Sequence, residues 1–164
     1  MKRVAVLLLS LLFLVGCKAA PANAFENSYF IAVLPEPFEQ VLNTSAICFA
    51  PYGDPLLSSS ITFCSTELNW YFDSYTAEEY ENALVSLCGY ESLTDVEVTA
   101  CRIDGYDARR IACKVQIEQG THDLIIYAIS ADRTYFMILL NREGDGYIDE
   151  FDSMMNGFRL KVNP

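Results

Sequence analysis

The feature that constrains the fold most is a series of four extended segments, separated by short turns, in the C-terminal half of the chain. Two of the three turns contain glycine next to a polar residue, at Asp104-Gly105 and Gln119-Gly120, and the third is Ala131-Asp132. The segments between them are rich in apolar residues. Strands joined by turns of a few residues pair with their chain neighbours in antiparallel orientation. The most apolar segment, RTYFMILLN, is expected at the centre of the sheet. The predicted strands cover residues 95–103, 108–118, 121–130 and 133–141.

Further strands are expected before this meander. Residues 28–34 form an apolar run that ends at Pro35-Glu36-Pro37, and two more runs are separated by the turn Tyr52-Gly53-Asp54-Pro55. Residues 38–42 are expected to form a short helical turn. The two strands around the turn are expected at residues 46–51 and 58–64.

Two helices are indicated by a change in the period of the apolar residues. Thr76 and Glu79 have the spacing of a capping box, and Gly89 is a typical helix stop. A second helix is expected over residues 149–156, with Gly157 after it. The predicted fold class is therefore α+β, with an antiparallel sheet of about six to seven strands and two helices. The apolar stripe of the first helix consists of Ala77, Tyr80, Leu84 and Leu87.

The N-terminus predicts export and lipid attachment. A basic start is followed by an apolar run over residues 4–15, which is too short to cross a bilayer core of about 30 Å as a helix. Leu14-Val15-Gly16-Cys17 resembles the bacterial lipobox, which implies cleavage before Cys17 and acylation of its sulfur. The expected division is a signal peptide at residues 1–16, a lipidated tether at residues 17–28 and a single domain at residues 29–164. The expected location is the extracytoplasmic face of a bacterial membrane.

The charge of the chain limits its partners. The chain has 22 acidic and 11 basic residues and a formal net charge of −11. Nucleic acid binding requires lysine and arginine opposite the phosphates, so a nucleic acid partner is not expected. Electrostatic adhesion to anionic lipid is not expected for the same reason, and contact with the membrane is assigned to the N-terminal lipid.

The cysteines after Cys17 are odd in number and show no CxxC pair or zinc-finger spacing. An exported protein is able to form disulfides. Most of these cysteines lie in apolar strand contexts, where a thiol packs as a small hydrophobic group. Packing as free thiols is the favoured interpretation, and Cys48 with Cys64, on neighbouring predicted strands, is the first candidate for a disulfide.

The order of the predicted elements resembles that of the PsbP-like domain. The segments that carry the resemblance are LPEPF, YTAEEY, IDGYDARRI, RTYFMILL and FDSMMNGFRL, and it extends over residues 29–160. Glycine at position 157 stands where the family pattern has serine. The resemblance implies an α/β/α sandwich around an antiparallel sheet, a role in binding or assembly, and no catalytic residues.

The segment NREGDGYIDEFD, residues 141–152, is spaced like the calcium loop of an EF-hand. The preceding run is predicted to be a strand, whereas an EF-hand has a helix there. The alternative is a strand-to-helix turn, with flexible glycines and with Asp149 as the helix N-cap. The candidate calcium ligands are Asn141, Glu143, Asp145, Asp149 and Asp152.

An aromatic segment and one histidine complete the candidates. The aromatic residues either line a groove for a protein or glycan partner or cover the end of the sheet. His122 is expected at the surface, without a nucleophile or acid in reach. The aromatic candidates are Trp70, Tyr71, Phe72 and Tyr75.

The function that these observations favour is a lipid-anchored extracytoplasmic binding or assembly-accessory domain, without catalytic activity and without a cofactor. Two alternatives remain open at this stage. One is an exported protein that responds to calcium through residues 141–152. The other is a hydrolase without a recognisable motif, since no nucleophile elbow, phosphate loop or zinc-protease motif is present in the chain.

Overall fold

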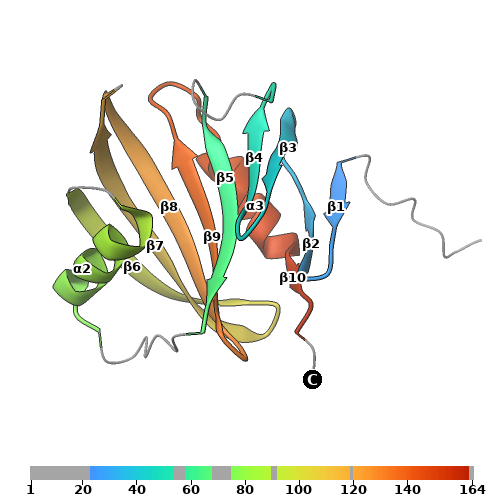
Figure 1. The fold of residues 1–164 in the computed structure, drawn as a ribbon. Coiled ribbons are helices and arrows are strands. Elements are labelled where there is room, and N and C mark those ends of the chain that lie inside the picture. The colour runs from blue at the N-terminus through green and yellow to red at the C-terminus, as the bar shows by residue number, and fades with distance from the viewer. Residues whose placement is uncertain (1–22, 54–57, 68–74, 90–91, 119, 163–164) are drawn as a thin grey trace, which may run out of the picture.

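The structure is a computed structural model, and it describes residues 23–53, 58–67, 75–89, 92–118 and 120–162. It confirms the predicted α+β class: two helices and two antiparallel sheets occupy the described residues (Figure 1). The strands are β1 (Ala24–Glu26), β2 (Phe30–Val33), β3 (Phe38–Asn43), β4 (Ile47–Pro51), β5 (Ser60–Thr66), β6 (Leu93–Ile103), β7 (Tyr106–Ile117), β8 (Gly120–Ser130), β9 (Thr134–Asn141) and β10 (Arg159–Leu160), and the helices are α2 (Ala77–Cys88) and α3 (Ile148–Gly157).

The large sheet has seven strands in the order β3-β4-β5-β9-β8-β7-β6. The predicted meander is confirmed, because β6 to β9 pair successively and antiparallel. The expected central position of the most apolar strand is also confirmed, since β9 lies between β5 and β8. In contrast, residues 38–42 belong to edge strand β3, where a helical turn was expected. Backbone pairing with β4 determines this conformation, and the local sequence carries no sign of that partner.

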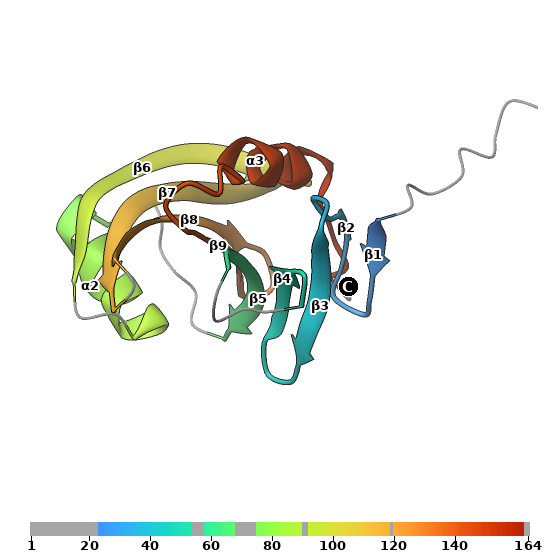
Figure 2. The same cartoon turned by 90° about the horizontal axis from the view of Figure 1, so that it is seen from above.

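Both faces of the central strands are covered. Along β8, alternate side chains point to opposite faces of the sheet. Ile125, Tyr127 and Ile129 belong to the apolar cluster that contains α3 and the small sheet. The intervening residues, Leu124 and Ile126, belong to the cluster that contains α2. The helices therefore lie on opposite sides of the curved sheet, as Figure 2 shows.

Helix α2 begins at the predicted capping box. The Thr76 hydroxyl accepts from the Glu79 amide at 3.2 Å, and the Glu79 carboxylate accepts from the Thr76 amide at 2.6 Å. These two bonds lower the pKa of Glu79. Gly89 ends the helix with φ +73°, a left-handed conformation that glycine adopts without steric cost. Tyr80 and Leu84 bury the inner face of α2 against the large sheet.

The small sheet has the order β1-β2-β10 and covers part of the face that carries α3 (Figure 1). It changes the expected domain boundary, because β1 lies within the predicted tether. Ala24 pairs with Val33, and Glu26 pairs with Ile31. The folded part of the chain therefore begins no later than Ala24.

Helix α3 is held to the sheet by an ion pair as well as by apolar contacts. The Arg110 guanidinium donates to both carboxylate oxygens of Asp152, at 3.0 and 2.8 Å. Tyr127, opposite Arg110 in the sheet register, donates its hydroxyl to the same carboxylate at 2.9 Å. Phe151 and Met155 are buried next to this cluster. The charged contact therefore sets the rotation of α3 over β7 and β8.

The stretches of helix within the described residues are too short or too polar to cross a membrane. The predicted lipidation site, Cys17, lies outside the described residues.

We expect Asp152→Asn to lower the free energy of unfolding by about 2 kcal/mol, because it leaves the Arg110 cation without its counter-charge in a partly buried position. The two side chains are only 26% and 32% exposed. Urea denaturation measures the change.

The matched control is Asp107→Asn, which breaks the Arg102–Asp107 pair whose side chains are 72% and 70% exposed. Its cost should stay within about 0.5 kcal/mol, because solvent screens an exposed pair. Equal losses in both variants would contradict the role assigned to the Arg110–Asp152 contact.

Candidate functional site

The acidic segment between β9 and α3 uses its polar groups within the fold. Asn141 is buried, and its side-chain oxygen accepts from the Tyr147 amide at 3.0 Å. The Asp145 carboxylate accepts from the hydroxyl and the amide of Ser59, at 2.6 and 3.2 Å. The Ser59 hydroxyl in turn accepts from the Arg142 amide at 2.9 Å. These bonds hold the segment against the start of β5.

The candidate calcium ligands do not converge. Asp152 is bound to Arg110, and Asp149 is exposed in the first turn of α3. Within the described ranges, no group of three or more acidic, histidine or cysteine side chains is placed to hold a metal ion. The candidate ligands are therefore not brought together, and the segment is the turn between a strand and a helix that the alternative interpretation predicts. The expected N-cap at Asp149 is wrong, since Tyr147 occupies that position without a side-chain cap.

His122 is buried, with 5% of its surface exposed, so its predicted surface position is wrong. Its Nδ1 accepts from the Glu143 amide at 3.2 Å. Its Nε2 is buried and has no hydrogen-bond partner among the described residues. This hydrogen bond links β8 to the loop after β9, so the imidazole contributes to packing between that strand and that loop.

The candidate disulfide is not formed. Cys48 and Cys64 are free thiols. In the register of β4 and β5, Cys48 lies opposite Thr62, so the two cysteines are diagonal neighbours on one face. Diagonal positions are about 7–8 Å apart, which is beyond the usual span of a disulfide. Burial raises the pKa of the Cys64 thiol.

Of the aromatic candidates, Tyr75 is described, whereas Trp70, Tyr71 and Phe72 lie outside the described residues. The Tyr75 ring makes an edge-to-face contact with Tyr80 of α2, with ring centroids 5.3 Å apart. Tyr75 thus packs against the first turns of the helix. Tyr75 is also partly buried against the apolar cluster that contains α2.

A cavity of about 370 Å³ opens between the two sheets, at the end where β2 and β9 begin and β5 ends. The small sheet and its flanks supply Ser28, Tyr29 and Lys161. Tyr29 is 51% exposed, and its ring lies 6.1 Å from that of buried Phe63. The large sheet and its β8–β9 turn supply Ser65, Asp132, Arg133 and Tyr135. We take this space, the inter-sheet cavity, as the candidate functional site.

The charged groups of the inter-sheet cavity are arranged around Asp132. Its carboxylate accepts from the Tyr135 hydroxyl at 2.9 Å and lies 3.7 Å from Nε of Arg133. Burial, followed by the bond to Asp132, raises the pKa of Tyr135 to about 12. Across the cavity, the Lys161 ammonium donates to Glu26 at 2.6 Å and to the Asn27 carbonyl at 2.7 Å. The site therefore has a fixed, largely hydrogen-bonded wall and two cations.

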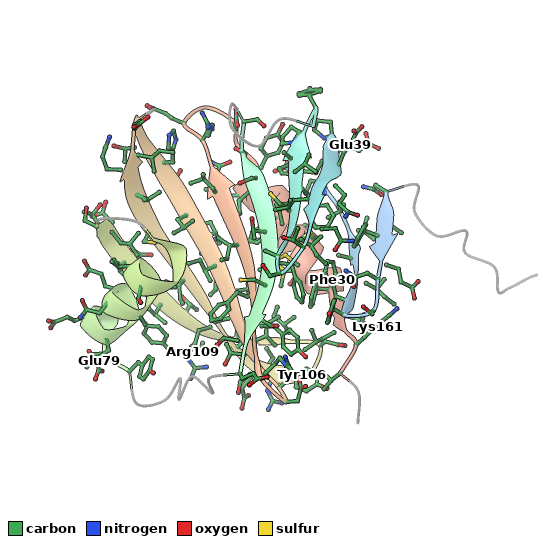
Figure 3. The ribbon with its side chains drawn as sticks, in the orientation of Figure 1. Phe30, Glu39, Glu79, Tyr106, Arg109 and Lys161 are labelled. Carbon is green, nitrogen blue, oxygen red and sulfur yellow. The ribbon has the colours of Figure 1, made fainter. Side chains whose placement is uncertain are left out.

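Sequence reasoning did not identify this cavity, although one signal was present. The chain has few basic residues, but several of them lie next to turns or strand ends. Antiparallel pairing brings these turns and strand ends to one end of the large sheet. The register places Asp107 opposite Ser130 and Thr134 opposite Thr66 at that end. Figure 3 shows Tyr106 and Lys161 toward this end and Glu39 toward the other. The basic residues concerned are Arg102, Arg133, Arg159 and Lys161.

A second hollow, of about 390 Å³, lies at the opposite end of β2, between the β2–β3 connection and α3. Its wall includes Val33, Leu34, Pro35 and Met154, so it is mainly apolar. It lies next to the first described residue, because Asn23 hydrogen-bonds to Leu34. His122 lines neither of these two spaces.

The arrangement of a seven-stranded antiparallel sheet between helices, with a short sheet at one side, is a PsbP-like fold. The solution structure of cyanobacterial PsbP (CyanoP) from Synechocystis sp. PCC 6803 superposes with a TM-score of 0.62 at 12% identity, over 90% of this chain and 98% of that one. LpqN of Mycobacterium tuberculosis, described as involved in cell envelope biogenesis, gives 0.53 at 9% identity, over 88% of each chain.

A Bacteroides thetaiotaomicron protein superposes with a TM-score of 0.54 at 9% identity. The match covers 86% of this chain but 49% of that protein, so this chain spans about half of its length. No sequence-family profile matches the chain, and no curated protein matches it. At these identities the likeness shows the fold alone.

We expect Ser59→Ala to lower the free energy of unfolding by about 2 kcal/mol, since it removes a buried hydroxyl that both donates and accepts. Ser65→Ala, at the exposed other end of β5, is the matched control and should change stability by less than about 0.5 kcal/mol. Chemical denaturation of both variants measures the difference. A neutral Ser59→Ala variant would contradict the assigned link between β5 and the acidic loop.

We expect Tyr135→Phe to reduce the loss of stability in alkaline solution. A folded-state pKa of about 12 exceeds the unfolded value of about 10, so the protonated hydroxyl stabilises the fold below pH 10, and this contribution is lost as pH rises toward 12. Urea unfolding at about pH 9, 10 and 11 measures the slope. Tyr52→Phe, at an 83% exposed side chain, is the control. Identical slopes for wild type and Tyr135→Phe would contradict the assignment.

Proposed function

We propose that this protein is a lipid-anchored extracytoplasmic binding domain that acts as an accessory or assembly factor at a bacterial membrane and catalyses no reaction. The observation that carries the proposal is the sequence Leu14-Val15-Gly16-Cys17 directly after an apolar run of signal-peptide length. Acyl chains on Cys17 contribute about 0.8 kcal/mol for each buried CH₂, so two or three chains retain a small domain at the bilayer.

The position of β1 supports a short attachment. Strand β1 begins at Ala24, and Asn23 is hydrogen-bonded to Leu34, so residues 18–22 alone separate Cys17 from the described fold. Five residues span at most about 18 Å when fully extended. The domain would therefore be held close to the membrane surface, with little freedom to change its orientation relative to the bilayer.

The direction of the β1–β2 hairpin supports an orientation. Ala24 pairs with Val33 at one end of the hairpin, whereas Ser28 and Tyr29 lie at its turn and line the inter-sheet cavity. An anchor that leads into Ala24 would therefore leave the inter-sheet cavity on the side away from the membrane.

The structural likenesses support a role in the envelope. LpqN is described as involved in cell envelope biogenesis, and CyanoP is a cyanobacterial PsbP. We extend the envelope role described for LpqN to this protein in general terms. We place its protein or glycan partner at the inter-sheet cavity. A cavity of this volume lies at the lower end of the range for ligand sites.

We expect the wild-type protein to sediment with membranes and to incorporate labelled palmitate, and Cys17→Ser to lose both properties. The physical reason is that Cys17 carries the proposed acyl chains. Cell fractionation after sodium carbonate washing, together with metabolic labelling, makes the measurement. Cys48→Ser, at a cysteine within the fold, is the matched control and should keep both properties. Labelling that persists in Cys17→Ser would contradict the proposal.

A further inference from the structure

We propose that the inter-sheet cavity binds the carboxylate of a small ligand or of a peptide C-terminus. The inference deepens the proposed binding function by naming the chemistry of the ligand. The first argument is that hydrogen-bond donors outnumber acceptors among the side chains that line the cavity. The donors are Ser28, Tyr29, Ser65, Arg133 and Lys161.

Among the described residues that line the cavity, Asp132 is the one with a carboxylate, and this carboxylate is already engaged. Asp132 accepts from Tyr135 and lies beside Arg133. A separation of 3.7 Å between Nε of Arg133 and Asp132 is electrostatically attractive but too long for a hydrogen bond, so this pairing does not use the guanidinium donors. A planar guanidinium binds a carboxylate through two parallel bonds.

Lys161 supplies the second cation from the opposite wall. Its ammonium has three donors, and two of them go to Glu26 and the Asn27 carbonyl. The backbone of Lys161 is fixed as well, because its amide donates to the Tyr29 carbonyl at 2.7 Å. Both basic residues therefore line one space from two separate walls, and each is positioned by contacts to its own wall.

The charges of the wall sum to zero, because Arg133 and Lys161 are balanced by Asp132 in the cavity wall and by Glu26 next to it. Desolvating a phosphate dianion costs more than desolvating a monocarboxylate, and a wall without net positive charge does not offset the difference. The site therefore favours a singly charged ligand. The exposed Tyr29 ring offers an apolar surface for the group that carries the carboxylate.

In the test, the full chain is purified in detergent and titrated with N-acetyl-alanyl-alanine. Calorimetry or NMR chemical shifts report the binding. The C-terminal amide of the same dipeptide is the uncharged counterpart, acetate represents a small free carboxylate, and inorganic phosphate represents the other oxyanion. We expect the acid to bind at least about tenfold more tightly than the amide and than phosphate, as a charge-assisted bond requires.

Arg133→Gln and Lys161→Gln are each expected to weaken binding of the acid about tenfold. Lys114→Gln removes an exposed cation from β7, outside the cavity, and is expected to change binding less than twofold. Acetate that binds as tightly as the dipeptide acid would assign the site to small carboxylates, and weaker acetate binding would assign it to peptide ends; both outcomes support the proposal.

The proposal is overturned if the acid does not bind, if the amide or phosphate binds as tightly as the acid, or if Arg133→Gln and Lys114→Gln have equal effects. The result does not depend on lipid attachment, because the protein is studied away from the membrane. Failure of this inference and failure of the membrane assignment are therefore separate results.

Discussion

Strands β8 and β9 bury both of their faces, and the rest of the structure follows from this requirement. Leu124 and Ile126 on one face of β8, and Ile125 and Ile129 on the other, are at most 3% exposed. A sheet with two apolar faces needs two covers. Helix α2 supplies one of them, while α3 and the small sheet supply the other. The second cover is built from segments at the two ends of the described chain.

The covers are attached in different ways. Helix α2 is defined locally, by its capping box and its apolar stripe, and it packs against the sheet through Tyr80 and Leu84. Helix α3 has no side-chain cap. Its placement depends on the carboxylate of Asp152, which meets Arg110 and Tyr127 on two neighbouring strands. Most of its stabilisation therefore comes from tertiary contacts, as is usual for a short helix.

Local sequence signals predicted the parts of the structure that local physics determines. The meander follows from alternating apolar residues and turn glycines, and the start of α2 follows from Thr76 and Glu79. Residues 38–42 were misjudged because pairing with β4 decides their conformation. His122 was misjudged because its burial depends on the Glu143 loop, which folds back from 21 positions along the chain.

The same distinction explains the candidate site. The acidic loop matched a calcium motif in spacing, yet its Asp145 is held by Ser59, a residue 86 positions away. The inter-sheet cavity combines Tyr29, Ser65, Arg133 and Lys161, which come from four separate parts of the chain. The periodicity of neighbouring residues carries no information about contacts between groups so far apart in the sequence. The strand order brings these groups together.

The small sheet has a consequence for the order in which the chain is able to complete its fold. Strand β2 lies between β1, the first strand of the described chain, and β10, the last. One edge of β2 and much of one face of the large sheet therefore stay uncovered until the segment that contains α3 and β10 has arrived. A chain that crosses a membrane from its N-terminus would complete its fold only after nearly all of it had crossed. The small sheet is thus the last part of the described fold to be completed, because its middle strand needs a partner from each end of that part of the chain.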